Sequence, residues 1–157
     1  MENRYEAFTL LLASITRRIR RIKTDAVAEY GLKSPHVTCL YYLYKHPGAL
    51  TAAELCELCD EDKAAISRSI LYLEQNGFLV RAATTLGDLG QGSARHYRAP
   101  LTLTEKGVGV ARYIAERIDC VLLQVGEGVT EEERATLYRT LEKIDRNLRE
   151  VCKSCED

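Results

Sequence analysis

The sequence predicts a mainly α protein with a small β-hairpin wing, an α+β fold in which a winged helix-turn-helix lies between long terminal helices. Three observations support this prediction. Two short helical patterns joined by a tight turn occupy residues 51–77, two strand-like runs then flank a Gly-rich stretch, and apolar stripes at helical spacing run toward both ends of the chain.

The first short helix begins at Thr51, whose hydroxyl can cap it. Ala52, Leu55 and Leu58 recur at helical spacing and are expected to form its buried face. The following helix has the clearer pattern. Its inward residues are expected to be Ile66, Ile70 and Leu73, and a second face carries Ala64, Ser67, Arg68 and Leu71.

The second short helix is expected to end at Asn76-Gly77, a pair suited to a left-handed C-cap, and Phe78-Leu79-Val80 then begins an extended run. A further helix is predicted over residues 104–125, interrupted by Gly126 to Gly128. The apolar face of this helix is expected to hold Ala111, Ile114, Ile118, Val121 and Val125. Thr130, followed by three glutamates, opens the last helix.

Several of these segments together resemble the MarR (multiple antibiotic resistance regulator) family of winged-helix transcription factors. The resemblance rests on ELCELCDEDKAAISRSILYLEQNGFLVR, with Ser67-Arg68 and Asn76-Gly77 in it, and on LTLTEKG at residues 101–107. The upstream GLKSPHVTCLYYLYKHPGALT is similar to the family's second helix, so the likeness covers roughly the whole chain. It implies one MarR-like unit over residues 1–157, with a DNA-binding part at 34–103 and a helical dimerisation part at 1–30 and 104–157.

The resemblance implies a double-stranded DNA operator as partner. The net charge of −1 does not oppose this, because DNA affinity depends on where Lys and Arg gather. The acidic residues 60–62 at the start of the recognition helix are nevertheless expected to repel phosphates. The wing departs from the family pattern, because six residues separate Asp88 from Arg95, and its tip at 86–93 is Gly-rich. The expected DNA contacts are Thr51, Lys63, Ala64, Ser67, Arg68, Arg95 and Arg98.

The terminal stripes imply a homodimer in a MarR-like protein, although an intramolecular bundle would also satisfy them. The expected interface consists of Phe8, Leu12, Ile15, Ile19, Leu137, Leu141, Ile144 and Leu148. The basic run at residues 17–23 lies around the isoleucines of the first stripe, and we interpret it as a solvated surface.

The resemblance also implies a small aromatic or phenolic effector. A set of tyrosines with one histidine suits such a pocket, because tyrosine combines apolar area with a hydroxyl group. A plain core helix has the same pattern, so both interpretations stay open. The candidate residues are Tyr30, His36, Tyr41, Tyr42 and Tyr44.

Six cysteines with no sign of a secreted chain argue against a disulfide framework. Ordinary packing is the first interpretation for Cys39, Cys56, Cys59 and Cys120. Cys152 and Cys155, near the end of the chain and beside Lys153, are the candidates for redox sensing. Zinc sensing through His36, His46 or the cysteines is a weaker alternative, and we predict no resident metal or cofactor.

These features predict a non-enzymatic DNA-binding regulator, a homodimeric repressor released from a pseudo-palindromic operator by a small-molecule effector. The alternatives are a thiol-based redox-sensing regulator, a thiol oxidoreductase that uses the Cys-x-x-Cys pairs, and a winged helix used only for protein contact. An oxidoreductase fold would need alternating strands and helices, which the pattern lacks. No apolar run reaches membrane-spanning length and the N-terminus lacks a signal-peptide layout, so a cytoplasmic location is expected.

Overall fold

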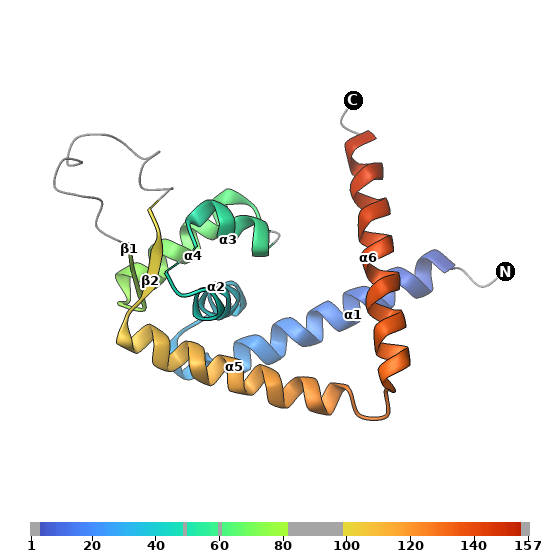
Figure 1. Ribbon diagram of the computed structural model, residues 1–157, viewed down its shortest axis with the longest axis horizontal. Helices are drawn as coiled ribbons and strands as arrows, with labels where there is room; N and C mark the ends of the chain where they lie inside the picture. Colours follow the sequence, from blue (N-terminus) through green and yellow to red (C-terminus); the bar gives the residue numbers. More distant parts are fainter. Residues whose placement is uncertain (1–3, 49, 60, 82–98, 155–157) are drawn as a thin grey trace. The chain divides into compact units, whose positions relative to one another are not determined.

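The computed structural model describes residues 4–48, 50–59, 61–81 and 99–154. The chain divides into two compact units, residues 1–118 and 119–157, and each is described by itself. In chain order the elements are α1 (Arg4–Asp25), the 3-10 turn η1 (Ala28–Tyr30), α2 (Ser34–Lys45), α3 (Ala52–Cys59), α4 (Lys63–Gln75), β1 (Leu79–Arg81), β2 (Leu101–Leu103), α5 (Glu105–Val125) and α6 (Glu131–Ser154) (Figure 1). The fold is therefore mainly helical with one small sheet, as the sequence predicted.

The sheet is a two-stranded antiparallel pair that forms the base of the wing. Leu79 pairs with Leu103, Val80 with Thr102 and Arg81 with Leu101. The backbone N–H of Leu101 also donates to the Leu50 carbonyl at 2.8 Å, which ties β2 to the segment before α3. The predicted wing tip, residues 86–93, lies outside the described residues.

The core of the first unit forms where α2, α3, α4 and the strands meet (Figure 1). Helix α2 passes through it and buries Val37, Leu40 and Leu43 completely or nearly so. From α4 the core receives the three predicted residues, Ile66, Ile70 and Leu73, each at most 1% exposed. Apolar burial of this kind is the main stabilising contribution in a domain of this size.

Helix α3 confirms the predicted cap and corrects the predicted face. Thr51 and Glu54 form a capping box: the Thr51 N–H donates to Glu54 Oε2 at 2.7 Å, and the Glu54 N–H donates to Thr51 Oγ1 at 3.3 Å. Ala52 and Leu55 are buried, but the expectation that Leu58 is buried was wrong, since it is 40% exposed. A helix turns 100° per residue, so position 59 returns to the face of position 52 and position 58 does not. Cys59 packs against the core in its place.

The corner between α4 and β1 is closed by two glycines. Gly77 has φ of 71°, the left-handed conformation that was predicted to end the helix. Gly107, in the first turn of α5, lies against the backbone of Phe78, so that a Cβ there would come within 1.9 Å of the Phe78 carbonyl oxygen. Close approach of the two backbones at this corner therefore requires glycine.

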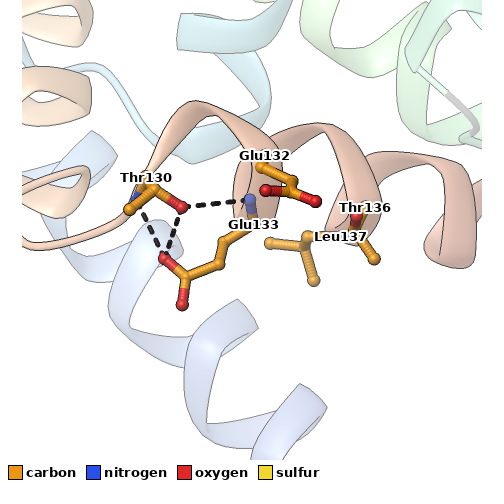
Figure 2. A pocket seen from close by; sticks show the side chains of 5 residues that line it. All are labelled: Thr130, Glu132, Glu133, Thr136 and Leu137. Atoms are coloured by element: carbon orange, nitrogen blue, oxygen red, sulfur yellow. Dashed lines mark hydrogen bonds between the residues drawn. The ribbon is translucent and has the colours of Figure 1, made fainter.

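The second unit contains the end of α5 and the whole of α6. Thr130 and Glu133 form another capping box, which confirms the predicted start of the last helix (Figure 2). No residue of α6 is buried in the single chain, and its predicted stripe includes Leu137, 51% exposed, and Leu148, also 51% exposed. The expectation that Cys120 is buried was wrong, because its side chain is exposed.

Within the part of the chain that the structure describes, no helix combines the length and the apolar character needed to span a bilayer.

Candidate nucleic-acid interface

The outward face of α4 carries a compact set of side chains suited to DNA. Lys63, Ala64, Ser67 and Arg68 are all exposed, while Ile66 and Ile70 hold the opposite face in the core. Among the described residues, neither Lys63 nor Arg68 has an ion-pair partner or a hydrogen-bond partner. Both cations are therefore available to an external anion, and the guanidinium of Arg68 has the donor geometry that matches a guanine edge or a phosphate.

The acid at the start of α4 has a structural role. Asp62 is the N-cap, and its carboxylate accepts a hydrogen bond from the Ala65 N–H at 2.8 Å. The helix dipole places partial positive charge at this end, which the carboxylate partly neutralises. From the sequence, Asp62 was expected to repel phosphates. Its function as the N-cap of α4 is a separate reason for an acidic residue at this position. It orients the first turn, where Lys63 and Ala64 lie.

The middle of α4 is fixed by contacts with η1 and α2 that the sequence did not reveal. The Tyr72 hydroxyl donates to the Gly31 carbonyl at 2.9 Å, and the Tyr72 ring stacks on His36 with centroids 4.4 Å apart. His36 Nδ1 accepts a hydrogen bond from the Lys33 N–H at 3.1 Å. Burial, and then the charge of Lys33, lower the pKa of His36, so the neutral ring that can accept this bond is favoured.

The end of α4 is fixed by the start of α5. Lys106 Nζ donates to the Asn76 carbonyl at 2.9 Å and lies 4.1 Å from the centre of the Phe78 ring. The Thr104 hydroxyl donates to the Gly77 carbonyl at 2.7 Å. An ion pair between Arg81 and Glu74, 3.4 Å from Nε to Oε2, joins β1 to α4. These contacts hold the end of α4 against the first turn of α5 and against β1.

Of the remaining predicted DNA contacts, the structure describes Thr51 but not the two wing arginines. Thr51 lies before α3, and its hydroxyl both donates to Glu54 Oε2 at 2.7 Å and accepts from the Glu54 N–H. The Thr51 hydroxyl and the Thr51 N–H both donate to the Glu54 carboxylate, and these two bonds lower the pKa of Glu54. A contact of Thr51 with DNA stays a prediction. Arg95 and Arg98 lie outside the described residues, so their contacts stay predictions from the sequence alone.

The proposed effector residues are distributed over η1 and α2. Tyr30 makes an edge-to-face contact with Tyr113 of α5, with centroids 6.3 Å apart, and Tyr41 makes one with Tyr42 at 5.7 Å. Tyr41, Tyr42 and Tyr44 are half-buried against the core. The pocket stays a prediction, and the structure adds Tyr113 and Tyr72 as aromatic neighbours of its candidate residues.

A surface depression in the second unit is lined by Thr130, Glu132, Glu133, Thr136 and Leu137 (Figure 2). Glu133 uses its carboxylate to accept bonds from the Thr130 N–H and hydroxyl, both at 2.8 Å, and these bonds lower its pKa. Helix capping accounts for this arrangement, and we assign no ligand to it.

Three of the four cysteines that were expected to pack in the core do so. Cys39 is buried, and Cys56 and Cys59 are partly buried against the same core, whereas Cys120 is exposed. Of the predicted redox pair, Cys152 is exposed on α6, and Cys155 lies outside the described residues. The described side chains contain no group of three His, Cys, Asp or Glu residues placed to hold a metal ion.

The sequence and the fold were compared with those of known proteins. Residues 30–86, which include α2, α3, α4 and β1, match the sequence model of the MarR family. No curated protein matches the chain in sequence.

Among solved structures, the S. aureus MepR–DNA complex is 18% identical, with 93% of this chain and 99% of that chain covered and a TM-score of 0.76. A MarR protein from Peptoclostridium difficile is 21% identical, with 94% and 91% covered and a TM-score of 0.76. A putative MarR family regulator from Listeria monocytogenes, complexed with a 26mer DNA, is 22% identical, with 87% and 85% covered and a TM-score of 0.72. At these identities the likeness establishes the fold.

Proposed function

We propose that this protein, a MarR-family winged-helix protein by the sequence of residues 30–86 and by its fold, is a homodimeric transcriptional regulator that binds an operator in double-stranded DNA. The observation that carries the proposal is the outward face of α4. This face presents Lys63, Ala64, Ser67 and Arg68. The helix is capped by Asp62, its opposite face is buried in the core, and its C-terminal end is bonded to Thr104 and Lys106.

DNA recognition would divide between this face and the wing. Arg68 has the fork of donors that reads guanine, Ala64 can approach a thymine methyl, and Lys63 can meet a phosphate. Arg95 and Arg98 of the wing would contact the sugar-phosphate backbone or the minor groove. Two solved structures of the same fold were determined with DNA, which supports this assignment of the partner.

Dimerisation would place two recognition helices about one turn of DNA apart, roughly 34–36 Å, on a pseudo-palindromic operator. Exposed apolar side chains at both ends of the chain support the dimer, since water-exposed stripes of this length mark association surfaces. The exposed or half-exposed side chains are Phe8, Leu12, Ile15, Ile19, Leu137, Leu141, Ile144 and Leu148. The interface itself is a proposal.

Regulation would act through the contacts that fix α4. An aromatic or phenolic effector among Tyr30, His36 and Tyr41 would bind beside η1 and α2, and these elements hold Tyr72 of the recognition helix. A ligand shifts an equilibrium only by its differential affinity for the two states. An effector that prefers a different spacing of the two recognition helices would therefore release the operator, and the protein would act as a repressor.

A mobility-shift titration tests this function. DNA from the protein's own promoter region and a scrambled fragment of equal length are titrated at two salt concentrations. We expect tighter binding of the promoter fragment and a steep loss of affinity with salt. Equal and weak binding of both fragments at low salt would contradict the proposal and favour a winged helix used for protein contact. In the same assay, small phenolic compounds should weaken binding and raise the melting temperature of the free protein.

A further inference from the structure

The outward face of α4 continues one turn beyond Arg68. Spacings of four, three and four residues along the helix connect Ala64, Arg68, Leu71 and Gln75, all of which are exposed. Side chains at these spacings lie on one face of a helix. Leu71 therefore shares the face of Ala64 and Arg68, which are already assigned to DNA.

Leu71 differs in character from the rest of this face. It is 52% exposed, whereas Ile70 and Leu73, close to it in the sequence, are completely buried. Among the described residues of α4, Leu71 is the only large apolar residue that is exposed. An isolated exposed leucine is ordinary on a protein surface, so the argument depends on where this one lies.

Contacts on both flanks fix the rotation of α4 near Leu71. A helix turns about 100° per residue, so Tyr72 and Glu74 lie on opposite flanks of α4, with Leu71 on the outward side between them. The Tyr72 hydroxyl donates to the Gly31 carbonyl at 2.9 Å. Glu74 forms an ion pair with Arg81, 3.4 Å from Oε2 to Nε. Leu71 is therefore held outward and cannot turn into the core while both contacts persist.

We propose that Leu71 reads the C5-methyl group of a thymine in each operator half-site. This inference rests on the proposed function. Thymine alone among the four bases of DNA carries a methyl group, and this group projects into the major groove. The side chain of leucine has no hydrogen-bond donor or acceptor, so it recognises a base edge through apolar contact.

The helical rise places this contact relative to the one proposed for Arg68. Leu71 follows Arg68 by three residues, which is about 4.5 Å along the helix axis. Successive bases along a DNA strand are about 3.4 Å apart. The thymine should therefore lie within two base pairs of the guanine that Arg68 reads, in both halves of a pseudo-palindromic operator. Ala64 lies about 6 Å from Arg68 in the opposite direction, so it would meet a different base pair.

Uracil tests the contact because it differs from thymine by this methyl group alone. The promoter fragment is prepared with thymine, and again with uracil in place of every thymine, and both are titrated with the parent protein and with Leu71→Ala. Burial of one methyl-sized group should give the parent a preference for the thymine fragment of about 4-fold per half-site, or about 15-fold for two. The preference should fall by this factor in Leu71→Ala.

Two control variants make the comparison specific. Leu58→Ala removes the same side chain from α3, where it is 40% exposed, and should keep the thymine preference of the parent. Leu71→Met retains an apolar side chain of similar volume and should keep most of the preference. Since Leu71 is exposed, Leu71→Ala should also unfold at the same urea concentration as the parent.

Fragments with uracil at a single thymine then locate the methyl group, and we expect the loss at one thymine in each half-site. An equal thymine preference in the parent and in Leu71→Ala overturns the assignment, as does a loss of affinity in Leu71→Ala that is the same on both fragments. A loss spread evenly over many thymines also contradicts it, because such a loss reflects the shape of the DNA. Failure of the parent to prefer the promoter fragment over a scrambled one instead contradicts the proposed function.

Discussion

Replacement of Gly107 by alanine should damage the corner where the recognition helix, the wing and α5 meet. The added Cβ would lie 1.9 Å from the Phe78 carbonyl oxygen and 2.9 Å from the carbonyl carbon, whereas real contacts essentially never fall below 3.0 Å. The two backbones must therefore separate by more than 1 Å. Overpacking costs about 1–3 kcal/mol, and weakening of the 3.1 Å bond from the Thr104 N–H to the Phe78 carbonyl costs about another 1 kcal/mol. Better helix propensity returns about 1 kcal/mol, so a net loss of about 1–3 kcal/mol is expected.

Gly109 provides the matched control, because it lies in the same helix and a Cβ there meets nothing within 4 Å. Gly109→Ala should gain about 1 kcal/mol from helix propensity alone. Urea unfolding at fixed protein concentration measures both variants. We expect free energies of unfolding that differ by about 2–4 kcal/mol, or melting temperatures that differ by roughly 5–15 °C. Equal stability of the two variants would refute the close packing of α5 on the corner.

Three further substitutions test separate parts of the account. Leu141→Asp would place an unpaired charge in the proposed interface at a cost of several kcal/mol, so sedimentation should show monomers. The control Ala135→Asp changes the opposite face of α6 and should stay dimeric. Tyr72→Phe removes one hydrogen bond and keeps the ring, and it should lower the free energy of unfolding by about 0.5–1.5 kcal/mol; no change would show that the bond is unimportant. The pKa of His36 is lower in the folded protein than in the unfolded chain, so below about pH 6.5 the unfolded chain binds more protons. The free energy of unfolding should therefore fall as the pH drops from about 6.5 through the lowered pKa. In urea titrations at several pH values, His36→Gln should flatten this dependence.

The sequence predicted the elements of the fold because local signals mark them. Thr51 and Thr130 are each followed three residues later by a glutamate and both start helices, and Gly77 ends α4 as predicted. Leu58 was wrongly predicted to be buried because the three-residue spacing from Ala52 to Leu55 was repeated once more. A helix needs a spacing of four at this point, so the next position that packs against the core is Cys59. Exposure of Cys120 could not be foreseen, since its position on α5 is compatible with either environment.

The candidate site was predicted in part. The outward face of α4 follows from helical periodicity, so Ser67 and Arg68 could be assigned to it directly. The contacts that hold this helix depend on tertiary structure. Nothing in the local sequence indicates that Tyr72 stacks on His36, or that its hydroxyl donates to the Gly31 carbonyl, because each pair joins segments far apart in the chain.

The central claim is that α4 reads DNA, and the affinity of an Arg68→Ala dimer for the promoter fragment tests it most directly. Arg146→Ala, which removes the same charge from the face of α6 opposite its apolar stripe, is the control. With two half-sites at about 1–3 kcal/mol each, fluorescence anisotropy should show a loss of about 30-fold or more for Arg68→Ala and little change for Arg146→Ala. An Arg68→Ala protein that remains dimeric and binds the fragment as tightly as the parent would contradict the account.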